Sequence, residues 1–188
     1  MRTRALVPVA VAALALAGCG DHALVLRVDL LSYVDPALRT VAFGPIPAAP
    51  GGLATGEQVL VDDVTVNLVG GMEGVAEAEA VELTMAVIAR DSTGSGTDTL
   101  RLYASDEATE PLATPPAVVQ VLTLLPGVTD TVVTTVTADR RVAELFVQSR
   151  MRIGVTASAR GPESGEPLVG SLELSALQAV VIAGRKAP

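Results

Sequence analysis

The sequence predicts an all-β protein folded as an antiparallel β-sandwich, of jelly-roll or immunoglobulin-like type, with about eight strands. Three observations predict this class. Valine and threonine are abundant, and their β-branched side chains suit the pleated surface of a strand. Short segments of alternating apolar and polar residues recur along the chain. Glycine and proline separate these segments at regular spacing, which is typical of a sandwich.

The strands are predicted from this alternation in chain order. The segment 81–89 has the clearest pattern, because Val81, Leu83 and Met85 alternate with polar or small residues. Loops rich in proline or glycine separate most of the segments. The predicted strands are residues 23–30, 59–68, 81–89, 100–103, 118–125, 130–137, 151–158 and 172–182.

Two long polar loops are expected to join neighbouring strands as hairpins. Residues 91–97 would form a flexible turn between the third and fourth strands, and residues 160–170 would join the last two. Because binding residues gather on loops, these two loops are the expected binding surface. At most one short helix is expected, near 139–148, with Asp139 placed to cap its first turn.

The N-terminal segment has the features of an export signal. Two arginines give it a positive start, and an apolar stretch of signal-peptide length follows, too short to span a membrane. The stretch ends in leucine, alanine, Gly18 and Cys19, the only cysteine of the chain. This order resembles the lipobox of bacterial lipoproteins, in which an aliphatic and two small residues precede the cysteine. The resemblance implies cleavage between Gly18 and Cys19 and acylation of Cys19.

The resemblance divides the chain into three parts. Residues 1–18 would be a cleaved signal peptide, residues 19–23 the lipidated cysteine with a short tether, and residues 24–185 a single β-sandwich domain. It also implies an extracytoplasmic protein of the bacterial cell envelope, held in the lipid bilayer through acylated Cys19. Gly20, and not aspartate, follows the cysteine. By the same resemblance, this implies the outer rather than the inner membrane in a Gram-negative cell.

The charge of the chain limits its partners. The formal net charge is −8, and removal of the signal would leave 170 residues with a charge of about −10. Nucleic acid is not an expected partner, because so acidic a chain cannot replace the counterions on phosphate. With its one cysteine acylated the chain would form no disulfide, so its stability must come from the core.

Motifs of common enzyme sites are missing from the sequence. The only histidine is His22, beside the expected anchor, so the usual base of a hydrolase is not in the domain. There is no G-x-S-x-G motif, no phosphate-binding loop and no cluster of histidine and cysteine. A pair of carboxylates is the one enzymatic alternative. We therefore expect a non-enzymatic protein without a cofactor.

Asp91 and Asp98 are the candidate metal ligands. They flank a loop rich in serine, threonine and glycine, and oxygen ligands on loops suit Ca²⁺. The competing interpretation is that both are solvated turn residues.

Two functions remain open at this point. The first is an envelope lipoprotein whose sandwich binds a protein partner or serves as an accessory in an envelope assembly. The second is a module that binds a small ligand or carbohydrate, with Ca²⁺ dependence as an option. The second function predicts Tyr33 or Tyr103 beside carboxylates on a concave face, and burial of both tyrosines would count against it.

Overall fold

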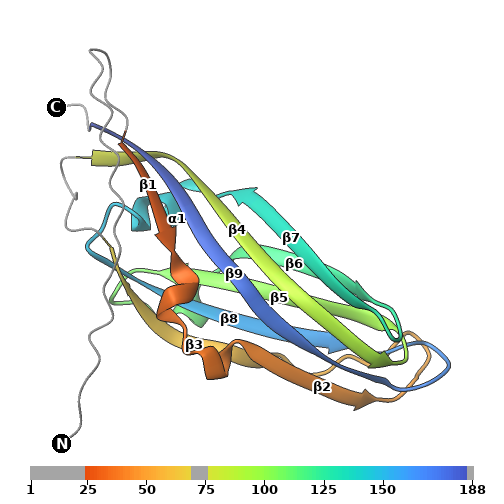
Figure 1. Cartoon of the computed structure of the whole chain (residues 1–188). Helices are drawn as coiled ribbons and strands as arrows, with labels where there is room; N and C mark the ends of the chain where they lie inside the picture. The colour runs from red at the N-terminus through yellow and green to blue at the C-terminus, as the bar shows by residue number, and fades with distance from the viewer. Residues whose placement is uncertain (1–23, 69–75, 186–188) are drawn as a thin grey trace, which may run out of the picture.

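The computed structural model describes residues 24–68 and 76–185, which form two antiparallel β-sheets packed face to face (Figure 1). The expected all-β sandwich is thereby confirmed. Over the described ranges the chain forms nine strands, one α-helix and three short 3₁₀ helices. None of these helices is long and apolar enough to cross a membrane.

Sheet A is built around its two longest strands. Its members are β1 (Leu24–Asp29), β2 (Thr40–Ile46), β4 (Ala76–Thr93), β7 (Thr129–Thr137) and β9 (Leu168–Arg185). β4 and β9 pair along most of their length, and β7 pairs with the other edge of β4. β1 and β2 pair one after the other with the second edge of β9. Together they act as one interrupted edge strand.

Two aspartates cause this interruption. Asp29 accepts a backbone N–H two residues on at 3.1 Å and caps the 3₁₀ helix η1 (Leu30–Tyr33). Asp35 does the same at 2.8 Å for η2 (Pro36–Leu38). A carboxylate that satisfies a nearby N–H offers the backbone an alternative to the strand ladder, so the chain leaves sheet A and then rejoins it.

Sheet B contains the remaining strands. Its members are β3 (Gln58–Asn67), β5 (Gly96–Ser105), β6 (Pro116–Leu124) and β8 (Arg150–Arg160). Their order is β3-β8-β5-β6, so β3 and β6 are the edges. The 3₁₀ helix η3 (Pro111–Ala113) packs on the outer face of this sheet, where a side chain at Gly154 would meet Leu112.

The strand order is that of a jelly roll. Counting β1 and β2 as one strand gives eight, and the first of these pairs with the last. The second then pairs with the seventh (β3 with β8), the third with the sixth (β4 with β7) and the fourth with the fifth (β5 with β6). This is one long antiparallel ribbon wrapped into two sheets. The immunoglobulin-like alternative groups its strands differently and is excluded.

The hairpin predictions were wrong. β4 and β5 are consecutive, yet they lie in different sheets, and so do β8 and β9. The segment 91–97 is not a long flexible turn either, because β4 runs to Thr93 and β5 begins at Gly96. Alternation locates a strand but does not tell whether a turn joins two neighbours or crosses between sheets.

The predicted helix is confirmed as α1 (Arg140–Leu145). Asp139 caps it, since its Oδ1 accepts the N–H of Val142 at 2.8 Å. Strand β2 was not predicted. It is short and ends in a proline-containing bulge between Phe43 and Ile46, so its signal resembled that of a loop.

One hydrophobic core lies between the sheets, and aliphatic side chains fill it. In β5 every second residue faces this core, including Leu100 and Leu102. The two phenylalanines, Phe43 and Phe146, are also buried in it. The largest fully buried side chains are Leu30, Leu83, Met85, Leu100, Leu102, Leu122, Leu124, Met151, Ile153, Leu168, Leu172 and Leu174.

Candidate functional site

Four connections between the sheets gather at one end of the sandwich, which we call the loop pole (Figure 1). They join β2 to β3, β4 to β5, β6 to β7 and β8 to β9. The start of β1 and the end of β9 lie at the opposite end. The two loops expected from the sequence to form a binding surface are therefore brought together in space.

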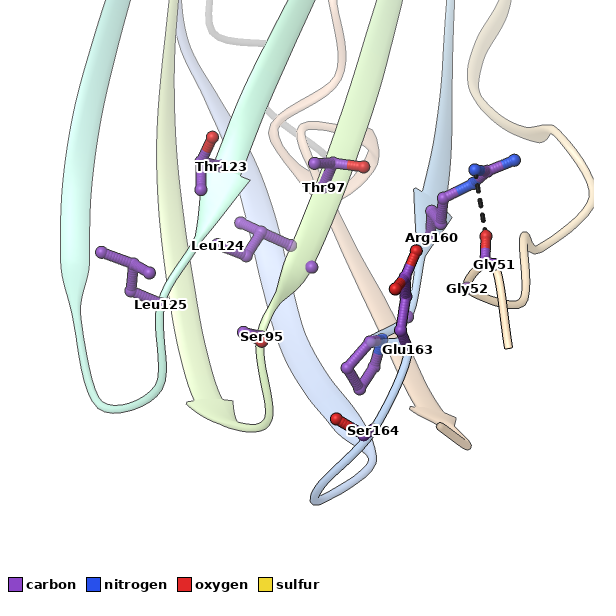
Figure 2. A pocket seen from close by; sticks show the side chains of 13 residues that line it. Gly51, Gly52, Ser95, Thr97, Thr123, Leu124, Leu125, Arg160, Glu163 and Ser164 are labelled. Carbon is purple, nitrogen blue, oxygen red and sulfur yellow. Dashed lines mark hydrogen bonds between the residues drawn. The ribbon is translucent and has the colours of Figure 1, made fainter. Parts of the chain in front are cut away.

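A surface hollow of ≈ 430 Å³ lies at the loop pole (Figure 2). Its walls come from the turn at 51–52, the start of β5, the end of β6 and the segment that follows β8. Hydroxyl groups, glycines and a few apolar side chains make up most of the lining. The lining residues are Gly51, Gly52, Ser95, Gly96, Thr97, Thr123, Leu124, Leu125, Arg160, Gly161, Pro162, Glu163 and Ser164.

Arg160 is the cation of this hollow. It is the last residue of β8, and its Nη1 donates a hydrogen bond to the carbonyl of Gly51 at 3.2 Å. Gly52 has φ +69°, and a side chain there would press on the stem of Arg160. Arg160 and Glu163 both line the hollow (Figure 2), yet neither forms a salt bridge with another described residue. The hollow thus presents both signs of charge.

Close backbone contact explains the glycines before β5. A Cβ at Gly96 would lie 2.3 Å from the carbonyl oxygen of Arg160 and 2.8 Å from Cδ2 of Leu168. Only glycine lets β5 begin so close to the end of β8 and the start of β9. The glycine-rich loop is therefore required by the packing of the loop pole.

Asp91 and Asp98 are buried, so they are not solvated turn residues. Asp98 is 1% exposed and Asp91 is 6% exposed. Each lies in phase with core residues of its strand, Asp98 with Leu100 and Asp91 with Ala89. Both oxygens of Asp91 and Oδ1 of Asp98 have no hydrogen-bond partner among the described residues.

Burial shifts the proton affinity of both carboxyl groups. Desolvation raises the pKa of Asp98 from 3.8 to about 6, against smaller opposing effects of nearby backbone N–H groups and Arg101. Desolvation also raises the pKa of Asp91. Neither pKa is shifted by the other carboxyl group, so the two act as separate sites.

The structure places Asp91 beside Asp130 instead of Asp98. A small cavity of ≈ 30 Å³, room for about one water molecule, is lined by Asp91, Asp130, Leu124 and neighbouring residues. Over residues 24–68 and 76–185, no three residues of histidine, cysteine, aspartate or glutamate form a metal-binding group. A Ca²⁺ site at Asp91 and Asp98 stays a prediction. Asp130 gave no signal in the sequence, because its proximity depends on the pairing of β7 with β4.

Glu57 organises a polar network on the outer face of sheet B. Its Oε1 accepts hydrogen bonds from the hydroxyl of Thr156 and, at 3.1 Å, from the hydroxyl of Tyr103. Arg101 lies 3.4 Å from the same oxygen. These contacts, the one with Thr156 first, hold the pKa of Glu57 below its usual value.

Both tyrosines are committed to internal contacts. Tyr103 is buried, and its hydroxyl donates to Glu57. Tyr33 is half-buried, and its hydroxyl donates to the carbonyl of Asn67 at 2.8 Å. Neither ring lines the hollow at the loop pole. Gly18, Cys19 and His22, the residues of the expected anchor, lie outside the described residues.

Comparison with known proteins yields a weak likeness of fold. No protein-family model matches the chain, and no curated protein matches its sequence. Structures of infectious bursal disease virus, strains Gt and Gx, match with TM-scores of 0.41 and 0.40 and sequence identities of 11% and 10%. Each match covers 94% of this chain, which spans 43% of the viral chain. A likeness of this size carries no functional argument.

Proposed function

We propose that this chain is a non-enzymatic lipoprotein of the bacterial cell envelope that presents its loop pole to a protein partner. Acylated Cys19 holds the protein in the lipid bilayer on the extracytoplasmic side, in the outer membrane if the cell is Gram-negative. Confinement to the membrane surface raises its effective concentration toward membrane-bound partners.

The observation that carries this proposal is that the first strand begins at the end of the sandwich opposite the loop pole. The described chain begins at Leu24, and Figure 1 places the start of β1 at the end of the sandwich away from the loop pole. Only a few residues separate Leu24 from Cys19, so an anchor there keeps that end next to the bilayer. The hollow with Arg160 and Glu163 then faces away from the membrane, where a partner can reach it.

The anchor is tested by intact-mass analysis of the protein purified from bacterial membranes. We expect a mass that starts at Cys19 and includes acyl chains, and we expect Cys19→Ala to abolish both the cleavage and the acylation. An unmodified chain that begins before Cys19 would contradict the anchor.

The partner is tested by affinity capture from gently solubilised membranes, with the full-length lipoprotein as bait. We expect one stoichiometric partner that is lost on Arg160→Ala. The matched control is Arg140→Ala, since Arg140 is 90% exposed in its side chain and lies on α1, away from the loop pole. A partner that is lost equally with both variants, or with neither, would contradict the role of the loop pole.

A module for a small ligand or carbohydrate is the second candidate. The hydroxyls and the two opposite charges of the hollow favour it, whereas the engaged tyrosines count against a stacking platform for sugars. Calorimetric titration of the full chain with sugars and with Ca²⁺ tests it. Heat that disappears on Arg160→Ala would support this candidate over a protein partner.

A further inference from the structure

Strand β7 is an exposed sheet edge that lacks the usual protection against pairing. Among the described strands it pairs only with β4. From Thr131 to Thr137 it contains valine and threonine alone, with no charge, glycine or proline. Val133 is 60% exposed. β7 pairs with β4 without a register shift, and a regular, uncharged edge of β-branched residues is a template for another strand.

Two other edges of the sandwich are protected. The edge made by β1 and β2 is interrupted by two 3₁₀ helices and contains Pro45, which has no N–H to donate. The β3 edge has two register shifts and carries Asp62 and Asp63. Bulges, charges and prolines are the devices that keep sheet edges from pairing. β7 has none of these devices, and it shares this lack with β6, the remaining edge, which has only Pro116 at its first residue.

The backbone ladder shows which groups of β7 face outward. At one end the N–H of Ala138 donates to Val81, and at the other the N–H of Asp91 donates to Val128. Hydrogen-bonded positions alternate in an antiparallel pair, so the even-numbered residues of β7 bond to β4. The odd-numbered residues then direct their N–H and C=O groups to the free edge. In agreement, the N–H of Thr131 is taken by the Asp130 carboxylate at 2.8 Å.

The sequence of β7 from Thr131 to Thr137 reads nearly the same in both directions. Around Thr134, an antiparallel copy of the strand would place Thr131 opposite Thr137 and Val132 opposite Val136. Val133 would lie opposite Thr135, and both direct their N–H and C=O groups to the free edge. The N–H of Thr131 would have to leave the Asp130 carboxylate to pair with Thr137 of the copy. The same register keeps inward side chains on the inward face in both copies. Cross-strand pairs of threonine with threonine are favourable.

We propose that β7 pairs with β7 of a second copy of this chain, in antiparallel register centred on Thr134. Charge favours this occupant, because two acidic chains repel over most of their surface and this edge is uncharged between Thr131 and Thr137. Asp130, the carboxylate that precedes this stretch, would face Ala138 of the copy and not another carboxylate. Because the twofold contact pairs the free edge of β7 in both copies, β7 has no edge left for a third copy, and the assembly closes as a dimer.

A hydrogen bond from Gln120 holds the middle of β7 in place. The Gln120 side chain is buried on β6, and its Nε2 donates to the carbonyl of Val132 at 3.2 Å. This bond ties the middle of β7 to sheet B, so the edge is held in place before a second copy arrives. The pairing does not depend on acylation of Cys19, and it stands apart from the partner proposed for the loop pole.

A cysteine cross-link tests the register directly. In the proposed dimer Thr134 lies opposite itself at a position without hydrogen bonds, where Cα atoms approach to about 4.5 Å, close enough for a disulfide. We expect Thr134→Cys, introduced into the full-length protein in detergent, to form a dimer on mild oxidation. The controls are the wild-type chain, which reports on Cys19, and Val59→Cys on the protected β3 edge, which is 52% exposed. Equal cross-linking of all three would overturn the proposal.

Sedimentation equilibrium of the full-length protein supplies the second test. Thr135→Pro removes one outward N–H that β4 does not use, so a folded monomer is expected, with the dimer dissociation constant raised by about tenfold or more. Thr135→Val keeps the N–H and should keep the dimer. A monomeric wild-type chain, or a Thr135→Pro dimer of unchanged affinity, would overturn the proposal. If Thr135→Pro fails to fold, the Thr134→Cys cross-link decides.

Discussion

Asp98 is a carboxyl group placed where the fold would otherwise put an aliphatic side chain. In the register of sheet B it lies between Leu122 and Ala159, and both of these are buried. An ionised carboxylate loses its hydration there, which is why its pKa is raised to about 6. The folded state therefore binds a proton at Asp98 more tightly than the unfolded state does.

This gives a pH dependence of stability with a definite sign. Between about pH 4 and pH 6 the folded state holds a proton that the unfolded state has lost, so the free energy of unfolding falls as pH rises. The loss from Asp98 is complete above pH 6 and amounts to roughly 3 kcal/mol. Asp91 acts in the same direction. Urea unfolding from pH 4.5 to pH 8 measures the slope, and we expect Asp98→Asn to flatten it.

Two exposed carboxylates act in the opposite sense. Hydrogen bonds from Thr156 lower the pKa of Glu57, and those from Arg152 lower the pKa of Asp63. Their stabilising effect is present above the unfolded pKa and is lost as pH falls through the folded one. We therefore expect stability to decline again below about pH 4. A wild-type profile that rises steadily from pH 4.5 to pH 8 would contradict the burial of Asp98.

Glu57 links the segment before β3 to β5 and β8. Replacement by glutamine keeps the size of the side chain but weakens the acceptor for Thr156 and Tyr103, so Glu57→Gln should cost about 1 kcal/mol of unfolding free energy. The matched control is Glu107→Gln, which removes an exposed salt bridge with Arg150 and should be nearly neutral. Thermal unfolding at pH 7 compares them. If the two substitutions lower the free energy of unfolding equally, the Glu57 network stabilises the fold no more than an exposed ion pair does.

At the scale of elements, Gly96 controls how β5 leaves the loop pole. Gly96→Ala would force a Cβ against the backbone oxygen of Arg160, so we expect a loss of about 2 kcal/mol or more in unfolding free energy. Gly56→Ala is the control, because a Cβ there meets nothing within 4 Å. Chemical denaturation measures both. If Gly96→Ala is as mild as the control, the close approach of β5 and β8 is wrong.

Sequence patterns located most strands, but they did not show where the side chains of a strand change from one face to the other. The alternation in β9 shifts between Leu174 and Leu177, because Ser175 is an extra residue in the pairing with β4. Its hydroxyl donates to the carbonyl of Ala86 at 3.1 Å, at the point where the register changes. Alternation that breaks and resumes one residue later is a signal of such a bulge. It could have been recognised from the sequence, unlike the partners of the strand.

At the scale of the whole molecule, the jelly roll buries its middle strands and leaves its edges open. β4, β9, β5 and β8 each pair on both sides, whereas β1, β2, β3, β6 and β7 pair on one side only. We expect amide hydrogen exchange to be slowest in the first group. Exchange followed by mass spectrometry, on monomer and dimer separately, checks this. Amides of β3 protected as strongly as those of β5 would contradict the order of sheet B.

The same experiment bears on the proposed dimer. Dimerisation should slow exchange at the outward N–H groups of Val133 and Thr135 and leave the β3 edge unchanged. If dimerisation instead slows exchange on β3 and not on β7, the dimer interface lies at the β3 edge and the pairing of β7 is wrong.

The sequence predicted the candidate site in part. Its two loops were expected to form the binding surface, and they do meet at the hollow with Arg160 and Glu163. The wall made by Gly51 and Gly52 was not foreseen, because the turn that contains them lies far from β8 in the chain. Side chains on loops can be recognised from composition, but the contact between two loops depends on how the intervening strands pair.

Local interactions account for what could be known from the residues alone. The all-β class, most of the strands and the cap of α1 follow from side-chain alternation and from a carboxylate that reaches its own backbone. The pairing order, the burial of Asp91 and Asp98 and the open edge of β7 were decided only by the tertiary structure. Each of these depends on which distant strands meet, since a strand's pattern specifies which face it buries but not which neighbour covers it.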